Sequence, residues 1–205
     1  MIKEACVGSI KEAILAQKND ANRIELCDNL DEGGTTPSYG TIKICKDILN
    51  IPIACMIRPR GGNFSYSKEE IDAMIEDIKI CKRLNVESVV FGVLKPDNSL
   101  DIENMKKLCD VAKPLKIVFH KAIDEMNNPL DVIDILYELG VNRILTSGTK
   151  NTAIEGSDIL NELIEKSKNR IKIVVAGKVT NENIDDLSKI INSDEFHGKK
   201  IVGNL

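Results

Sequence analysis

Two short segments of the sequence, Glu4–Cys6 and Glu25–Cys27, repeat the pattern Glu-x-Cys. Side chains alternate between the two faces of a β-strand, so the glutamate and the cysteine of each segment share one face. In the second segment, the apolar Ile24 and Leu26 should pack under helices. We therefore expect Glu4, Cys6, Glu25 and Cys27 to point into the interior of a barrel.

The two cysteines of this pattern, Cys6 and Cys27, predict a metal site. Their sulfurs would lie at similar depth on adjacent strands, and two thiolates favour a soft ion such as Cu(I). Zinc would want two further ligands. The alternative is that both cysteines are small apolar side chains that fill a layer of the core.

A second group of residues is suited to binding an anion. The segment 58–62 places Arg58 and Arg60 on the same side of an extended chain, beside the open N–H groups of Gly61 and Gly62. Paired guanidinium groups and free amides suit a carboxylate or a phosphate. The alternative is a turn in which the arginines pair with Glu4 and Glu25.

The segment Ser147-Gly148 follows another predicted strand and offers a hydroxyl and an open amide, so we add it to the candidate anion site. The chain has two histidines, His120 and His197, and both fall near strand ends on the polar face.

Four side chains are candidates for acid or base catalysis, because the pKa of a carboxylate or an imidazole in a dry cavity can move toward neutrality. They are Glu4, Glu25, His120 and His197. The sequence contains neither the order of residues expected for a Ser-His-Asp triad nor an HExxH motif. It therefore does not indicate which reaction these groups would catalyse. Buried charges must be compensated. The group is therefore either an active site or an internal salt-bridge network that only stabilises the barrel.

The elements that must position these residues are short β-rich runs with helical patterns between them. Alternation of this kind predicts a parallel sheet, and the spacing favours a single (β/α)8 TIM barrel over residues 1–205, with its site at the C-terminal ends of the strands. The predicted strands are 2–7, 23–27, 52–58, 88–94, 116–122, 143–147, 172–177 and 195–201.

Two helix starts carry the pattern of a capping box, Ser9 with Glu12 and Ser67 with Glu70. After the eighth strand only residues 202–205 remain, so the last helix should be missing or shortened. An apolar wall left uncovered there would favour self-association, and we expect a homodimer or a higher homo-oligomer.

Composition excludes several classes of protein. An aromatic content of 3% and a net charge of −4 argue against a nucleic-acid partner. The N-terminus has no apolar signal segment, and no run approaches the roughly 18 apolar residues of a membrane span. We therefore expect a cytoplasmic protein with no membrane partner. Its six cysteines include no CxxC pair and are expected to be free thiols.

Longer segments resemble the CutC family of copper homeostasis proteins: RIELCDNLDEGGTTPS, MIRPRGGNFSYS, FHKAIDEMNNP, RILTSG and EFHG. The resemblance covers nearly the whole chain. It implies a cytoplasmic, oligomeric TIM barrel, with copper bound at Cys6 and Cys27. The chain departs from the family at Lys121, where an arginine is common. Two functions remain open: a Cu(I)-binding homeostasis protein, or an enzyme acting on a small anionic, phosphorylated or carboxylated metabolite.

Overall fold

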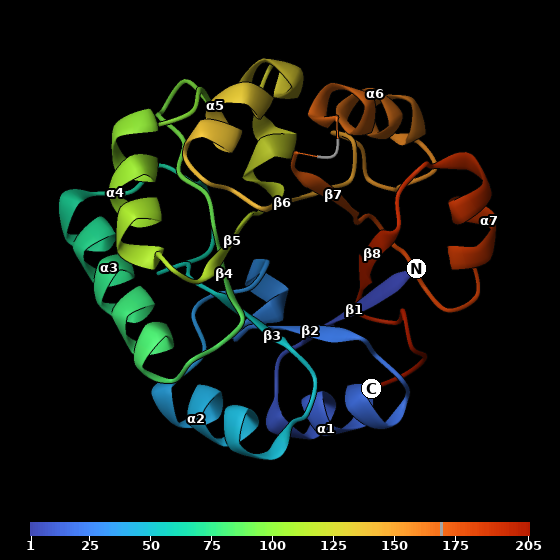
Figure 1. Cartoon of the computed structure of the whole chain (residues 1–205), viewed down its shortest axis with the longest axis horizontal. Coiled ribbons are helices and arrows are strands. Elements are labelled where there is room, and N and C mark those ends of the chain that lie inside the picture. Colours follow the sequence, from blue (N-terminus) through green and yellow to red (C-terminus); the bar gives the residue numbers. More distant parts are fainter. Residues whose placement is uncertain (169) are drawn as a thin grey trace.

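The computed structural model describes residues 1–168 and 170–205. Eight parallel strands pair in sequence order, and β8 pairs with β1 to close a barrel. The predicted α/β TIM barrel is therefore confirmed, and Figure 1 shows its strands inside a ring of helices. The strands are β1 (Ile2–Val7), β2 (Arg23–Leu26), β3 (Ile53–Met56), β4 (Ser88–Phe91), β5 (Lys116–Phe119), β6 (Arg143–Thr146), β7 (Lys172–Val175) and β8 (Glu195–Gly198).

The helices that cover the barrel are α1 (Ile10–Lys18), α2 (Tyr39–Ile48), α3 (Lys68–Arg83), α4 (Ile102–Ala112), α5 (Ile133–Glu138), α6 (Ser157–Ser167) and α7 (Ile184–Ile190). Three 3-10 helices lie in the loops: η1 (Leu30–Glu32), η2 (Lys121–Glu125) and η3 (Pro129–Val132). The capping box of Ser67 and Glu70 at the start of α3 is complete. At α1 only half of it forms, because the Glu12 carboxylate accepts a hydrogen bond from the N–H of Gly8 instead of Ser9.

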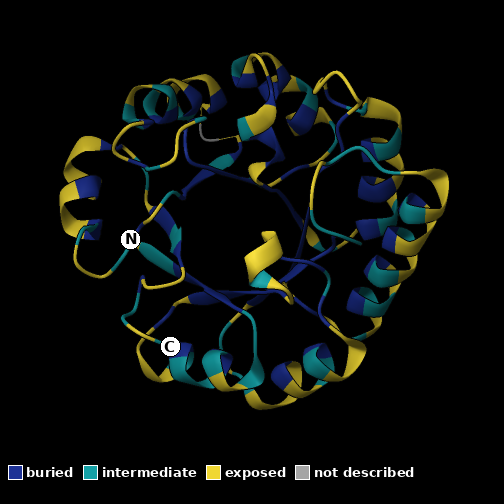
Figure 2. Cartoon of the chain, turned by 180° about the vertical axis from the view of Figure 1, so that it is seen from behind, coloured by how far each residue is buried: buried dark blue, intermediate teal, exposed yellow. Residues whose placement is uncertain are grey.

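The buried apolar residues form two layers on either side of the strands. The larger layer lies between the sheet and the helices, where Ile24 and Leu26 pack as predicted. The smaller layer fills the interior of the barrel and includes both Cys6 and Cys27. In Figure 2 the barrel strands are almost entirely buried and the helices carry exposed outer faces. The alternation read in β2 is therefore correct.

The segment after β8 differs from the expectation in one respect. No helix follows β8 in the described residues, as predicted, and the C-terminus lies near α1 (Figure 1). The apolar wall is nevertheless covered. Phe196 and Ile201 are fully buried, and Val202 and Leu205 pack against the outer core. Asn19 of α1 also donates a hydrogen bond to the carbonyl oxygen of Val202. The expectation of an uncovered wall was wrong, because the short tail folds back over it.

Among the described helices, none combines the length and the apolar character needed to cross a membrane.

Candidate functional site

A cavity of about 130 Å³ lies inside the barrel toward the C-terminal ends of the strands. The 3-10 helix η1, which follows β2, contributes Leu30 to its wall, and Gly33 lies just beyond η1. This helix is the short blue segment near the centre of Figure 1 and lies in front of the strands in Figure 2. The polar and sulfur-bearing side chains that line the cavity are Cys6, Glu25, Met56, Arg58, His120, Lys121, His197 and Lys199.

Cys6 and Cys27 are brought together as predicted. Cys6 lies in β1, Cys27 follows β2, and the sulfur of each is 3.5 Å from the same oxygen of Glu25, Oε2. The two sulfurs and a carboxyl oxygen of Glu25 all lie within 4.8 Å of one another. The three residues are buried. A single ion could therefore contact both sulfurs.

The contact between the two thiols separates their pKa values. The hydrogen bond that the Cys27 thiol donates to the Cys6 sulfur lowers the pKa of Cys6 well below its usual range. The same contact, together with burial, raises the pKa of Cys27. Burial also raises the pKa of Glu25 to about 8. The contact therefore makes Cys6 the more readily ionised of the two thiols.

His197 lies beside these groups and carries a positive charge. Its Nδ1 is 2.9 Å from Glu4 Oε1, and its Nε2 is 3.7 Å from Glu25 Oε2. Burial alone would lower the pKa of His197, but Glu25, Cys6 and Glu4 outweigh it and raise that pKa well above its usual value. The imidazolium of His197 thus stabilises the thiolate of Cys6.

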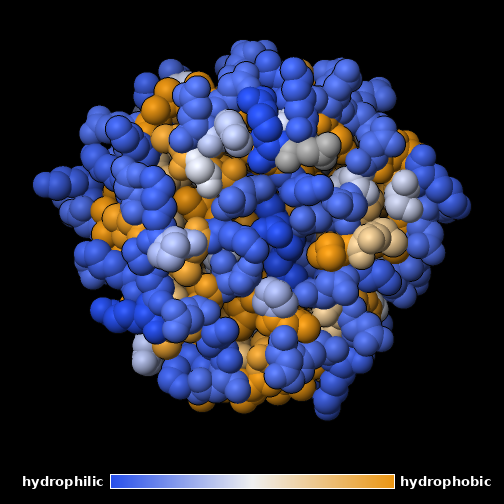
Figure 3. Space-filling view, viewed as in Figure 1, coloured by the Kyte–Doolittle hydropathy of each residue, from blue (hydrophilic) through white to orange (hydrophobic). Residues whose placement is uncertain are grey.

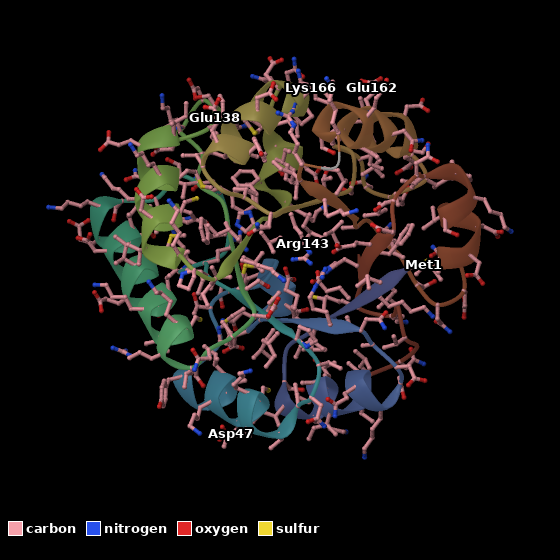
Figure 4. The ribbon with its side chains drawn as sticks, viewed as in Figure 1. Met1, Asp47, Glu138, Arg143, Glu162 and Lys166 are labelled. Atoms are coloured by element: carbon pink, nitrogen blue, oxygen red, sulfur yellow. The ribbon has the colours of Figure 1, made fainter. Side chains whose placement is uncertain are left out.

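A buried network of ion pairs lies toward the strand starts. Arg23 pairs with Glu4, and its Nη2 is 2.7 Å from Glu195 Oε2. Arg143 Nε is 2.8 Å from the same oxygen of Glu195. Figure 4 shows Arg143 near the barrel axis, and Figure 3, from the same side, shows that the centre of this end is hydrophilic. The predicted alternative of an internal salt-bridge network therefore exists, but with Arg23 and Arg143 in place of Arg58 and Arg60.

This network removes Glu4 from the candidates for acid or base catalysis. Burial would raise the pKa of Glu4, but the hydrogen bond with His197 and the charge of Arg23 outweigh it and lower that pKa to about 2. Glu4 also does not line the cavity. Sequence reasoning overlooked Arg23, although it shares the face of Glu25 and Cys27.

Arg58 lies in the cavity wall as predicted, but most of its donors are used. Its Nη1 donates to the carbonyl oxygens of Glu32 and Gly34, both at 2.9 Å, and its Nη2 donates to that of Gly62 at 2.7 Å. The guanidinium carbon also lies 4.9 Å from the ring centre of Phe64. Arg58 thus fixes the loops that follow β2 and β3.

Arg60 is not in the cavity, so the predicted two-arginine clamp is wrong. Its Nε lies 2.6 Å from Glu70 Oε1 at the start of α3, and its side chain is 40% exposed. The extended segment ends with β3 at Met56, so alternation no longer decides where Arg60 points. Gly61 and Gly62 do not line the cavity either.

Ser147 and Gly148 are likewise used within their own loop. The backbone N–H of Ser147 donates to Asp124 Oδ2 at 3.1 Å, and its hydroxyl donates to the same oxygen at 3.0 Å. The N–H of Gly148 donates to the hydroxyl of Thr146. Asp124 also pairs with Lys121, whose side chain does reach the cavity. No pattern in the sequence predicted a role for Asp124, because it lies in η2, beyond the end of β5.

His120 is buried in the cavity wall as predicted. Its Nδ1 accepts a hydrogen bond from the N–H of Ala122, and its ring centre is 4.7 Å from that of Phe64. Burial, helped by the charge of Arg58, lowers the pKa of His120 to about 3. The ring is therefore neutral, and because Nδ1 is an acceptor, its proton lies on Nε2.

The chain is similar in sequence and in fold to known proteins. The CutC family model matches residues 1–202. The human copper homeostasis protein cutC homolog is 40% identical over 196 residues, which span 96% of this chain and 72% of the human protein. A family protein CutC from Parabacteroides distasonis is 41% identical over 197 residues, which span 96% of this chain and 81% of that protein.

Among solved structures, CutC from Streptococcus agalactiae superimposes with a TM-score of 0.94 at 38% identity, covering 98% of this chain and 99% of that chain. The aldolase QR15 has a TM-score of 0.71 at 12% identity, covers 100% of this chain and 91% of its own, and shares the fold alone. The chain belongs to the CutC family of copper homeostasis proteins.

Proposed function

We propose that this protein binds one Cu(I) ion between the sulfurs of Cys6 and Cys27. The observation that supports this most directly is that both sulfurs approach the same oxygen of Glu25 and lie within 4.8 Å of each other. Thiolates are the protein ligands that a soft ion prefers. The donor set of two thiols fits Cu(I), which accepts few ligands, better than it fits zinc.

The surrounding charges favour a monovalent ion at this position. The hydrogen bond with Cys27 and the contact with His197 lower the pKa of Cys6 and so favour its thiolate. Binding then requires the loss of one proton, from Cys27, whose pKa is raised. Two thiolates with one Cu(I) carry a single negative charge, which the imidazolium of His197 balances. We therefore expect affinity to rise with pH.

Anaerobic titration with Cu(I) against a competing chelator tests this function. The wild type should bind one equivalent of Cu(I). Cys27→Ser should bind Cu(I) at least about 100-fold more weakly, because mutation even of residues that only support metal ligands lowers affinity by about 10- to 100-fold. Cys109→Ser is the matched control, because Cys109 is a buried thiol on α4 outside the barrel interior. Equal stoichiometry and affinity in wild type and Cys27→Ser would exclude the thiol pair as the copper site.

A second candidate function is catalysis on a small anionic metabolite at the same cavity. The observation that favours it is that Glu25 Oε1, Arg58 Nε and His120 Nε2 are buried and have no hydrogen-bond partner among the described residues. Copper binding by the two thiols uses none of these atoms. A thermal-shift comparison of phosphorylated and carboxylated metabolites tests this candidate, and stabilisation by none of them would argue against it.

We also infer a cytoplasmic location. The six cysteines are all free and buried, as expected for a protein that folds in a reducing compartment. Fractionation of cells expressing the tagged protein tests this location.

A further inference from the structure

The cavity contains more polar groups than copper binding requires. Five buried side-chain nitrogen or oxygen atoms lack a hydrogen-bond partner among the described residues, and three of them belong to residues that line this cavity. They are Glu25 Oε1, Arg58 Nε and His120 Nε2. A buried polar group without a hydrogen-bond partner destabilises the folded protein. Their gathering around one cavity indicates that a ligand supplies the missing partners.

Two of these three atoms are hydrogen-bond donors. The Nε2 of His120 carries the proton of the neutral ring, because its Nδ1 accepts the N–H of Ala122. The Nε of Arg58 is the one nitrogen of that guanidinium that does not contact a carbonyl oxygen. The ring centre of Phe64 lies 4.9 Å from the guanidinium carbon of Arg58 and 4.7 Å from the ring centre of His120.

The charge of this pair selects the kind of anion. Arg58 contributes one positive charge that no carboxylate of the described residues neutralises, since its partners are backbone carbonyl groups. His120 adds a donor without a charge. A singly charged anion with two acceptor oxygens matches this pair.

The size of the cavity limits the ligand further. The cavity has a volume of about 130 Å³. This volume suits a small acid. Glu25 Oε1 is a further polar atom without a partner. A hydroxyl group of the ligand could form a hydrogen bond with it.

We propose that the cavity binds a small monocarboxylate, most suitably a 2-hydroxy acid, whose carboxylate accepts hydrogen bonds from Arg58 Nε and His120 Nε2. The proposal rests on the second candidate function and deepens it by naming the ligand class and its two donors. It does not depend on copper, because neither donor belongs to the thiol pair. The hydroxyl group of the acid is placed toward Glu25.

Nuclear magnetic resonance of the histidine side chains tests this proposal directly. The chain has two histidines, so a histidine-labelled sample gives two ring systems that single substitutions assign. Lactate should shift the Nε2–H signal of His120 downfield and saturate at about millimolar concentration, as expected for so small a ligand. Lactamide has the same shape without the charge and should cause no saturable shift. A wild-type protein that fails to respond to lactate, or responds equally to lactamide, would overturn the proposal.

Two matched variants separate the donors from general charge effects. Arg58→Lys keeps the charge but removes Nε–H, and it should weaken lactate binding at least about tenfold. Arg60→Lys alters the arginine outside the cavity and should leave binding unchanged. Unchanged binding in Arg58→Lys would contradict the role of Arg58. If lactate binds but no tested carboxylate is chemically changed, the result supports the ligand site and argues against catalysis on these acids.

Discussion

The substitution Arg23→Met tests whether the buried charges hold the barrel together. Arg23 pairs with both Glu4 and Glu195, and the three side chains are 4–7% exposed. Removing one partner of a buried ion pair costs about 3–5 kcal/mol, because it leaves a charge without compensation. The pKa of Glu4 supports the same order of magnitude. Its decrease from 4.5 to about 2 corresponds to roughly 3 kcal/mol, of which Arg23 supplies a part.

Urea unfolding measures this loss as a change in the free energy of unfolding. Lys107→Met is the control, because Lys107 pairs with Glu103 at 2.8 Å on the surface, where the side chains are 52% and 80% exposed. The control should lose less than about 1 kcal/mol. The wild type should also lose stability as pH falls from 4.5 toward 2, where Glu4 becomes protonated, and Arg23→Met should lose less over that range. A cost for Arg23→Met no larger than that of the control would refute this account.

Two further predictions concern pH and assembly. The folded pKa of His120 is about 3 against 6.5 for a free imidazole, so the unfolded chain binds the proton more tightly and stability should fall as pH decreases from 6.5 to 3. Thermal unfolding of His120→Gln should show a weaker dependence over that window; an identical profile would contradict the assignment. The resemblance to the CutC family also predicts a dimer or a higher oligomer. Light scattering at low micromolar concentration tests this, and a monomer at that concentration would contradict the prediction.

The interior of the barrel could be predicted from the sequence because regular strands follow a simple rule. Alternation along β2 correctly placed Ile24 and Leu26 outside and Glu25 and Cys27 inside. Because β1 runs parallel to β2 as its neighbour, Cys6 was expected at a similar depth in the barrel to Cys27. In the sheet register Cys6 lies opposite Glu25. The rule failed beyond strand ends, where the position of Arg60 depends on a contact with Glu70 in the next helix.

The ion pairs were harder to predict, because they depend on closure of the barrel. Glu195 lies 172 positions from Arg23 in the sequence, and the two meet only because β8 returns to pair with β1. The prediction considered only arginines near the C-terminal ends of the strands. It therefore selected Arg58 and Arg60 and missed Arg23 and Arg143, which begin β2 and β6. A search for inward charges along whole strands would have found Arg23, which shares the face of Glu25.

The balance of charge explains how copper and a carboxylate can occupy one cavity. The positive charges of Arg23 and Arg143 in the interior are offset by the carboxylates of Glu4 and Glu195. Exchange of the Cys27 proton for Cu(I) leaves this balance unchanged, whereas a divalent ion would add one charge without compensation. A carboxylate adds one negative charge at the opposite set of groups, where Arg58 is held only by carbonyl oxygens. Glu25 adjoins both proposed sites, because its Oε2 contacts the two thiols and its Oε1 is the position proposed for the hydroxyl group.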